Sequence, residues 1–225
     1  MVQPRVVFFD FGGTLVEQLV EPVDVWLECS CALGLDVDPA SMTRALKTAD
    51  AWFQSIVFDY DGRTDEMWKL YEGRVLELLG TSDPDRTEQI HGRFRGVTWN
   101  RAYPESREVL QTLRGRGYPL HVISNATDEV RGRLREEGLL DYFESITYSQ
   151  GAGANKPDPR IFRLALSRAN CGASEAVHIG NLYKDDVVGA RSVGIAPVLV
   201  DRNDEHPDAD CPRVKDLRGV LGILP

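Results

Sequence analysis

The sequence lacks the features of a membrane protein or of a small secreted protein held together by disulfides. No apolar stretch in its 225 residues approaches the roughly 18 residues that a membrane-spanning helix requires. Its first residues, MVQPRVVFF, show neither the long apolar region nor the cleavage site of a signal peptide. Cysteine is scarce, and no pair has CxxC spacing: the four are Cys29, Cys31, Cys171 and Cys211. We therefore expect reduced thiols in a cytoplasmic protein that does not contact a membrane.

Basic residues are scarce relative to acidic ones. Lys and Arg number 26 against 35 Asp and Glu, which gives a formal net charge of −9. Because a nucleic-acid backbone requires a basic surface, this composition argues against a general nucleic-acid-binding protein. A small anionic molecule is still possible as a partner, because a site can be locally positive within an acidic protein.

Four short apolar segments have the composition of buried parallel strands. Each is nearly continuous in apolar character and is bounded by polar residues or glycine, as in strands covered on both faces. The segments are residues 6–10, 120–124, 176–180 and 196–201. Helical patterns lie between them at 105–117, 127–140 and 158–169, and residues 201–212 read as a polar surface loop. This alternation predicts an α/β fold with a doubly wound parallel sheet.

The strand signal disappears between about residues 17 and 97, and two stripes with helical spacing replace it. One stripe runs through Met42, Ala45, Leu46, Ala49, Trp52, Phe53 and Ile56, and the other through Met67, Leu70, Tyr71, Val75, Leu78 and Leu79. We expect the tryptophans of this region to pack in a helical bundle rather than to form a ligand cage. The sequence thus predicts an all-helical insertion at 17–97 between two parts of an α/β core, 1–16 and 98–225.

Polar residues follow the predicted strands at the points where the strands end. In an open parallel sheet, ligands bind beyond these carboxyl ends. The residues are Asp10, Ser124 with Asn125, and Asn181 followed by Asp185 and Asp186, with Lys156 in a loop before another helix. A nucleophile, hydroxyl and amide donors, a cation and paired carboxylates can therefore converge on one site.

This arrangement resembles the haloacid dehalogenase superfamily over essentially the whole chain. Asp10 and Thr14 in FFDFGGTL match that family's first motif, a strand ending in Asp-x-Asp-Gly-Thr. Ser124 in VISNATD matches the second motif and Lys156 in NKPDPRIF the third. GNLYKDDVVGARSVGI, residues 180–195, matches the acidic fourth motif. The order of the motifs is similar to the subgroup with a helical cap inserted after the first motif.

The resemblance implies a hydrolase that acts on a small phosphorylated or other anionic metabolite through an aspartyl-enzyme intermediate. Asp10 would be the nucleophile. Mg²⁺ and Lys156 would neutralise the charge of the transferring group. The metal would be held by the Asp10 carboxylate, the Gly12 carbonyl oxygen and an acidic residue of the fourth motif, Asp185 or Asp186.

The resemblance also suggests how the substrate would be held. The groups expected around the transferring group are Thr14, Ser124, Asn125 and the loop backbone at Gly13. The cap would close over the site and select the substrate. Arg44 and Lys47, about one turn apart in the cap, could meet an anionic substrate, although a solvated helix face also accounts for them.

Two residues depart from the family pattern. The phosphatases of the family carry an aspartate two residues after the nucleophile, which protonates the leaving oxygen, and this chain has Gly12. Such acid–base assistance contributes roughly 10²–10⁴-fold to the rate. The fourth motif usually begins Gly-Asp, and here Asn181 follows Gly180. A neutral amide is a poorer Mg²⁺ ligand than a carboxylate.

These departures leave two alternatives open. One is a carbon–halogen or carbon–phosphorus hydrolase of the same superfamily. Against it, the family's dehalogenases carry a tyrosine where this chain has Phe162, and the predicted cap offers only Lys47 and Lys69 as Schiff-base lysines. The other is a catalytically impaired member that binds a ligand. We expect His121 and His178, which fall inside apolar strands, to be core residues.

Overall fold

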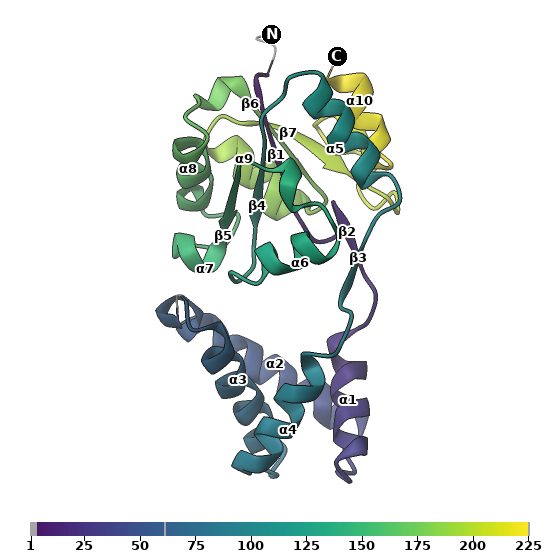
Figure 1. Ribbon diagram of the computed structural model, residues 1–225, viewed down its shortest axis with the longest axis vertical. Coiled ribbons are helices and arrows are strands. Elements are labelled where there is room, and N and C mark those ends of the chain that lie inside the picture. The colour runs from purple at the N-terminus through teal and green to yellow at the C-terminus, as the bar shows by residue number, and fades with distance from the viewer. Residues whose placement is uncertain (1–3, 61, 225) are drawn as a thin grey trace. The chain divides into compact units, whose positions relative to one another are not determined.

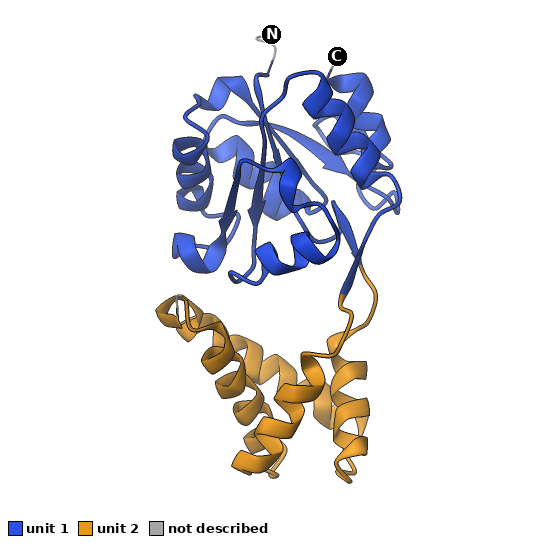
Figure 2. Cartoon of the chain, in the orientation of Figure 1, with its two compact units in different colours: residues 1–17, 100–225 blue, residues 18–99 orange. Residues whose placement is uncertain are grey.

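The computed structural model describes residues 4–60 and 62–224. The chain divides into two compact units, which Figure 2 shows in different colours. One unit comprises Met1–Glu17 and Asn100–Pro225, and the other is Gln18–Trp99. Across the described part of the chain, no helix combines the length and the apolar character that crossing a bilayer requires.

The larger unit is built on a six-stranded sheet with the strand order β5-β4-β1-β6-β7-β8 (Figure 1). All of its strand pairs are parallel. The strands are β1 (Val6–Phe9), β4 (Leu120–Ser124), β5 (Ser145–Tyr148), β6 (Ala176–Gly180), β7 (Ala196–Val200) and β8 (Arg213–Val214). The predicted α/β fold is confirmed, and the four predicted strands correspond to β1, β4, β6 and β7.

Two strands of this sheet, β5 and β8, were not predicted. Both lie at the ends of the strand order, and β8 has two residues. The sequence of β5, SITY, alternates polar and apolar residues and is only partly buried. Edge strands of this kind lack the continuous apolar run that marks a strand covered on both faces.

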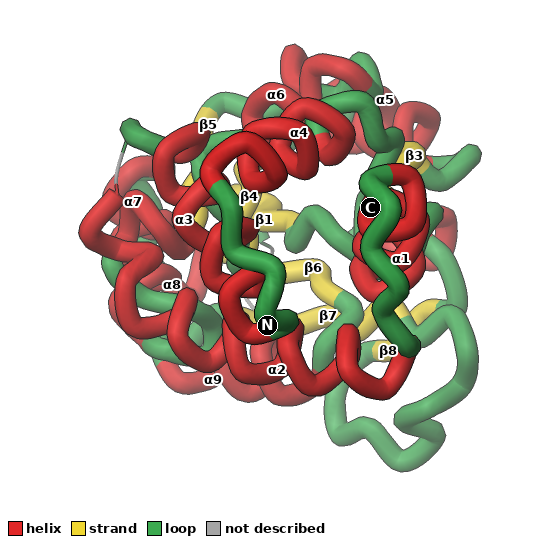
Figure 3. Tube along the Cα trace, turned by 90° about the horizontal axis from the view of Figure 1, so that it is seen from below, coloured by secondary structure: helices red, strands yellow, loops and turns green. Residues whose placement is uncertain are grey.

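Side chains of β1 alternate between two hydrophobic cores, one on each face of the sheet. Val7 and Phe9 pack in a core with residues of α5 (Ser106–Gly115), α6 (Val130–Glu136) and α10 (Val220–Ile223). Val6 and Phe8 pack in the second core with residues of α8 (Pro159–Arg168) and α9 (Gly189–Ser192). Helices therefore flank both sides of the strands (Figure 3). Because both faces are covered, polar groups gather at the strand ends rather than along the strands.

Shorter elements complete the larger unit. They are α7 (Ser149–Ala152), a π-helix at Tyr183–Val188 and 3₁₀ turns at Leu140–Tyr142, Ala173–Glu175 and Leu217–Gly219. A two-stranded sheet of β2 (Val16–Gln18) and β3 (Asn100–Ala102) lies where the chain passes between the two units. Asp158 caps α8, since its side chain accepts a hydrogen bond from the Arg160 amide, and Pro159 follows it as the first helical residue.

The smaller unit is helical. It contains α1 (Pro22–Ala32), α2 (Pro39–Ile56), a 3₁₀ turn at Val57–Tyr60, α3 (Thr64–Leu78) and α4 (Pro84–Phe94). Its main core is made from all four helices and includes Trp26, Met42, Leu76 and Ile90. A second cluster stacks Phe53 on Trp68, with the ring centroids 5.1 Å apart. These tryptophans pack against other apolar side chains, as expected.

Candidate active site

The first motif forms a turn at the carboxyl end of β1. The Asp10 amide donates a hydrogen bond to the carbonyl oxygen of Ile179 at 2.8 Å, which ties the end of β1 to β6. Gly13 adopts a φ of +75°, a left-handed conformation that favours glycine. Its amide donates to the carbonyl oxygen of Val16 at 2.8 Å and closes the turn. The Asp10 side chain at the start of this turn is 5% exposed.

Lys156 lies between two buried carboxylates. Its Nζ is 2.6 Å from Asp10 Oδ1 and 2.7 Å from Asp186 Oδ1. All three side chains are buried. The fold thus brings the predicted cation into contact with the predicted nucleophile and with one of the predicted acidic residues, although Asp10 and Lys156 are 146 positions apart in the sequence.

Asp186 is held by hydrogen bonds on both of its oxygens. Besides Lys156, Oδ1 accepts from His178 Nε2 at 2.9 Å, and Oδ2 accepts from the Leu182 amide at 2.9 Å. The close packing depends on Gly180, because a Cβ there would lie 2.2 Å from Asp186 Cγ. Asp186 itself lies on the π-helix, an irregular element that is frequent at functional sites.

Burial and neighbouring charges shift the pKa values of the three side chains in this cluster. Burial raises the pKa of Asp10 and the Asp186 charge adds to the rise, with Lys156 only partly offsetting it. Burial opposes the charge on Asp186 as well, but Lys156 and His178 outweigh it and hold the pKa of Asp186 well below its usual range. For Lys156, burial alone would lower the pKa, yet the two carboxylates raise it above its ordinary value. The cluster therefore contains a firmly charged lysine and an aspartate, the predicted nucleophile Asp10, whose charge is less stabilised.

The Asn181 carboxamide faces the first motif. In the orientation that satisfies its neighbours, its nitrogen donates toward Asp10 Oδ2 at 3.2 Å, Gly12 O at 3.0 Å and Thr14 Oγ1 at 3.2 Å. A Cβ at Gly13 would lie 2.3 Å from this amide, so glycine at position 13 also permits its approach. Asn181 therefore lies beside the two first-motif oxygens that were expected to hold a metal.

The other predicted residues lie around Asp10 and Lys156. Thr14 Oγ1 is 3.3 Å from Asp10 Oδ2. Ser124 is buried at the end of β4, the strand next to β1. Asn125 accepts from the Lys156 amide at 2.6 Å and donates to the Lys156 carbonyl oxygen at 3.1 Å, so it fixes the backbone of Lys156. Asp185 is partly exposed, with Oδ2 3.4 Å from Asn125 Nδ2.

Two residues that contact this site were not predicted as site residues. His178, expected to be a core residue, is fully buried but also donates to Asp186. Arg202, expected in a surface loop, donates to the Thr14 carbonyl oxygen at 3.1 Å, pairs with Glu105 at 2.8 Å and stacks on Tyr103 with 3.4 Å to the ring centroid. His178 could have been suspected, since it precedes Gly180 by two positions and points to the same face of β6. The sequence around Arg202 carries no comparable signal.

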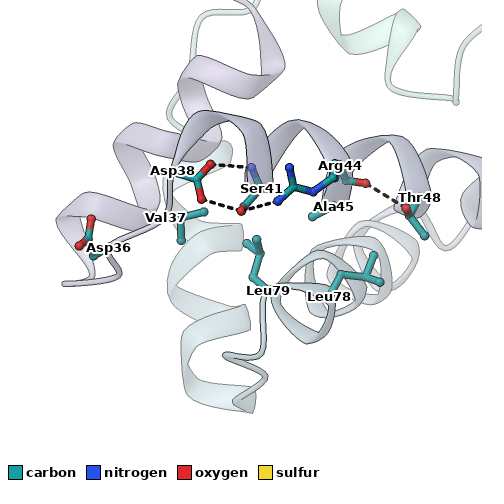
Figure 4. A pocket seen from close by; sticks show the side chains of 9 residues that line it. All are labelled: Asp36, Val37, Asp38, Ser41, Arg44, Ala45, Thr48, Leu78 and Leu79. Atoms are coloured by element: carbon teal, nitrogen blue, oxygen red, sulfur yellow. Dashed lines mark hydrogen bonds between the residues drawn. The ribbon is translucent and has the colours of Figure 1, made fainter.

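Arg44 and Lys47 lie on α2 in the helical unit, and both are exposed. Arg44 donates to Ser41 Oγ at 2.8 Å and lines a cavity of about 350 Å³ (Figure 4). Asp36 and Asp38 line the same cavity, so its charge is mixed. Among the described residues of the helical unit, no contact assigns Arg44 or Lys47 to an anionic ligand.

Comparison with known proteins shows which family and which folds this chain is similar to. A family model described as haloacid dehalogenase-like hydrolase matches residues 4–194. The human haloacid dehalogenase-like hydrolase domain-containing protein 3 is 31% identical over an alignment that covers 100% of this chain and 91% of the human protein. A phosphoserine phosphatase from Thermus thermophilus is 38% identical, covering 65% of this chain and 61% of that protein. The crystal structure of a HAD phosphatase from Thermococcus onnurineus superposes with a TM-score of 0.64 at 25% identity, covering 98% of this chain and 97% of that one.

Proposed function

We propose that this chain, which belongs to the haloacid dehalogenase-like hydrolase family, hydrolyses phosphate esters of a small anionic metabolite through an aspartyl intermediate on Asp10. The observation that carries the proposal is the contact of Lys156 with both Asp10 and Asp186 at the carboxyl ends of the strands. The phosphatase named among its relatives supports phosphate esters as the first substrates to test.

The proposed reaction has two displacement steps. A carboxylate oxygen of Asp10 forms a bond to phosphorus while the ester P–O bond breaks and the alcohol leaves. Water then attacks the same phosphorus, the bond to Asp10 breaks, and inorganic phosphate leaves with the carboxylate restored. Lys156 balances the negative charge that gathers around Asp10 during both steps. Asp186 holds the lysine in place, and His178 in turn holds Asp186.

Hydrogen-bond donors around the turn would position the phosphoryl group. Thr14 already contacts Asp10, and the buried Ser124 hydroxyl follows from the neighbouring strand. Gly12 supplies no acid, so the leaving alkoxide would take its proton from water. We therefore expect esters with acidic leaving groups to react faster than alkyl esters.

Mg²⁺ is the cofactor that the resemblance implies, and we propose that its ligands would be Asp10 Oδ2, the Gly12 carbonyl oxygen and the Asn181 amide oxygen. The first two atoms lie 3.2 and 3.0 Å from the Asn181 amide. Oxygen ligands around octahedral Mg²⁺, at about 2.1 Å from the ion, lie about 3.0 Å from one another, so the spacing suits the ion. Asp186 is a poor candidate because both of its oxygens already accept hydrogen bonds. Within the described ranges, no cluster of three His, Cys, Asp or Glu side chains forms another candidate metal-binding site. Bound Mg²⁺ would supply positive charge beside the phosphoryl oxygens.

We also propose that the helical unit, Gln18–Trp99, acts as the cap of the enzyme. Its separate core lets it move as a body, and closure of such a unit excludes water from a reaction centre. Arg44 and Lys47 on α2 are its candidate contacts for an anionic substrate.

A second candidate is hydrolysis of a carbon–halogen bond, and Gly12 is the observation that favours it. A halide leaving group needs no proton, so the missing acid would matter less. Phe162 is buried with its ring edge on His178, and it offers no hydroxyl at the position where the family's dehalogenases carry tyrosine. Carbon–phosphorus cleavage has less support, because Lys69 is paired with Glu88 at 2.8 Å.

A substrate panel tests these candidates. Purified protein is assayed against phosphate esters with and without Mg²⁺ and against 2-haloacids for halide release. We expect phosphate release that Asp10→Asn lowers by at least about 10³-fold, while Asp141→Asn, an exposed carboxylate of the same unit, serves as the matched control. A phosphoryl adduct on the peptide that contains Asp10, found by mass spectrometry after acid quenching, would identify the intermediate. Halide release alone would support the second candidate, and a folded protein without either activity would contradict both.

A further inference from the structure

The Asn181 carboxamide lies against two acceptor oxygens of the first motif, which a hydrogen-bond donor or a cation beside them would stabilise. Asp10 Oδ2 and the Gly12 carbonyl oxygen can only accept hydrogen bonds, and both are within 3.2 Å of the Asn181 amide. When no cation is present, the amide must therefore turn its N–H groups toward them. In this orientation a neutral side chain supplies the partial positive charge that a metal would supply.

The same side chain can also act as a ligand. Rotation of the carboxamide by half a turn exchanges its nitrogen and oxygen with little change in shape. Thr14 accommodates either orientation, because its hydroxyl can accept from the nitrogen or donate to the oxygen across the same 3.2 Å. An aspartate at position 181 would have no such choice, since both of its ends are acceptors.

The buried carboxylate Asp186 cannot strengthen the proposed metal site. Asp186 accepts hydrogen bonds from Lys156, His178 and the Leu182 amide. Asp10 is then the one carboxylate among the three proposed ligands, beside two neutral oxygens. Affinity for divalent ions with oxygen ligands rises with the number of charged ligands.

We propose that the Asn181 carboxamide is a reversible internal substitute for the metal. It bridges Asp10 and the Gly12 carbonyl oxygen through its N–H groups when Mg²⁺ is absent and turns its oxygen to the ion when Mg²⁺ binds. Mg²⁺ must then compete with hydrogen bonds within the protein, so it binds weakly and the metal-free site stays ordered. The inference rests on the metal site proposed above and on no particular substrate.

Mg²⁺ titrations of three proteins test the substitution without any substrate. Binding is followed by calorimetry and by thermal unfolding for the natural chain, Asn181→Asp and Gln111→Glu. Gln111→Glu is the matched control, because it makes the same change from amide to carboxylate on an exposed residue of α5, outside the site. We expect Asn181→Asp to bind Mg²⁺ at least about tenfold more tightly than the natural chain, and Gln111→Glu to bind as the natural chain does.

Metal-free stability gives the second readout. Without Mg²⁺, Asn181→Asp places a carboxylate against Asp10, so we expect its Tm to fall below that of the natural chain and to recover on adding Mg²⁺. The proposal is overturned if Asn181→Asp is as stable as the natural chain without metal, or if the natural chain binds Mg²⁺ as tightly as the variant.

The amide resonances of the natural chain give a test that does not depend on a variant folding. We expect Mg²⁺ to shift the side-chain ¹⁵N–H₂ signals of Asn181. The Asn203 amide, which donates to Glu205 in an exposed loop, serves as the internal reference. Saturating Mg²⁺ that leaves the Asn181 signals unmoved would contradict the rotation. The Mg²⁺ titrations, the metal-free stability and the amide resonances are all measured without substrate. A phosphatase assay that fails therefore does not decide this proposal, and the two proposals are judged separately.

Discussion

Gly12 and Gly13 are neighbours in the first motif, yet a side chain would meet different surroundings at each. At Gly13, a Cβ would collide with the Asn181 amide, and the backbone has a φ of +75°. At Gly12, a Cβ would meet nothing within 4 Å. Position 12 therefore has room for a side chain, and the missing acid is a difference in chemistry rather than a packing requirement.

We predict that Gly12→Asp raises kcat on alkyl phosphates. A carboxyl group there can protonate the leaving alkoxide, which is worth about 10²-fold at the lower end of general acid catalysis. An aryl phosphate with an acidic leaving group needs little protonation and should gain much less. Steady-state rates on the two ester types measure the difference.

Gly12→Asn is the control for this prediction. Asparagine has a side chain of nearly the same size as aspartate, but its carboxamide cannot act as a general acid. The variant should therefore leave the rate on alkyl phosphates close to that of the natural chain. Equal gains from Gly12→Asp and Gly12→Asn would rule out the acid as the cause.

Among the elements, the connection from β7 to β8 supports the first motif through one of its residues. Its second residue, Arg202, holds the carbonyl oxygen of Thr14. Its first, Asp201, is 5% exposed and accepts hydrogen bonds from the Glu205 amide at 2.8 Å, the His206 amide at 2.9 Å and Arg213 Nη1 at 2.8 Å. Asp201 therefore organises the loop that presents Arg202 to the first motif.

We predict a stability contribution from Asp201 that disappears in acid. Burial opposes its charge, but Arg213 and the two amides outweigh burial and lower the pKa of Asp201 from 3.8 to about 2. Because the folded pKa is the lower one, the contribution is present above pH 3.8 and is lost as the pH falls toward 2. Asp201→Asn should cost about 1–2 kcal/mol near neutral pH, and the difference from the natural chain should shrink over that range. Urea unfolding at a series of pH values measures it.

Asp208, an exposed residue of the same loop, provides the comparison. Asp208→Asn should leave the free energy of unfolding nearly unchanged near neutral pH. A constant difference between Asp201→Asn and the natural chain from neutral to acid pH would contradict the assigned role of the Asp201 charge.

At the scale of the whole molecule, the two units have separate hydrophobic cores. Leu76 on α3 is fully buried in the core of the helical unit, and Leu110 on α5 is fully buried in a core of the α/β unit. No cluster of buried apolar residues, as far as the described residues extend, draws members from both units. The stability of each unit should therefore depend on its own core.

We predict that a cavity in one core destabilises that unit alone. Leu76→Ala and Leu110→Ala each remove a buried side chain of the same kind, at a cost of about 2–5 kcal/mol. Hydrogen exchange should show lost protection in α1–α4 for Leu76→Ala and in the strands of the sheet for Leu110→Ala. Equal loss in both units from either variant would mean that the chain unfolds as one cooperative body.

The sequence by itself determined the class of fold and which residues stand at the strand ends. The apolar runs of β1, β4, β6 and β7 are long enough to be recognised, because parallel strands covered on both faces need continuous apolar character. Since such strands end at one edge of the sheet, the positions of Asp10, Ser124 and Asn181 at that edge follow from local patterns. The same patterns missed β5 and β8, which lie at the ends of the strand order and lack such runs.

Only the tertiary structure decided which of these groups touch. The contact of Lys156 with Asp10 and Asp186 spans 146 and 30 positions of sequence. It depends on strand order and on side-chain conformations that no local pattern encodes. Arg202 reaches the first motif from a loop that reads as solvent-exposed, and Asn181 occupies its place because Gly13 leaves room for it. The chemistry of the site depends on contacts of a few ångströms between distant segments, and the packing of the whole unit, with its ion pairs and hydrogen bonds, sets those distances.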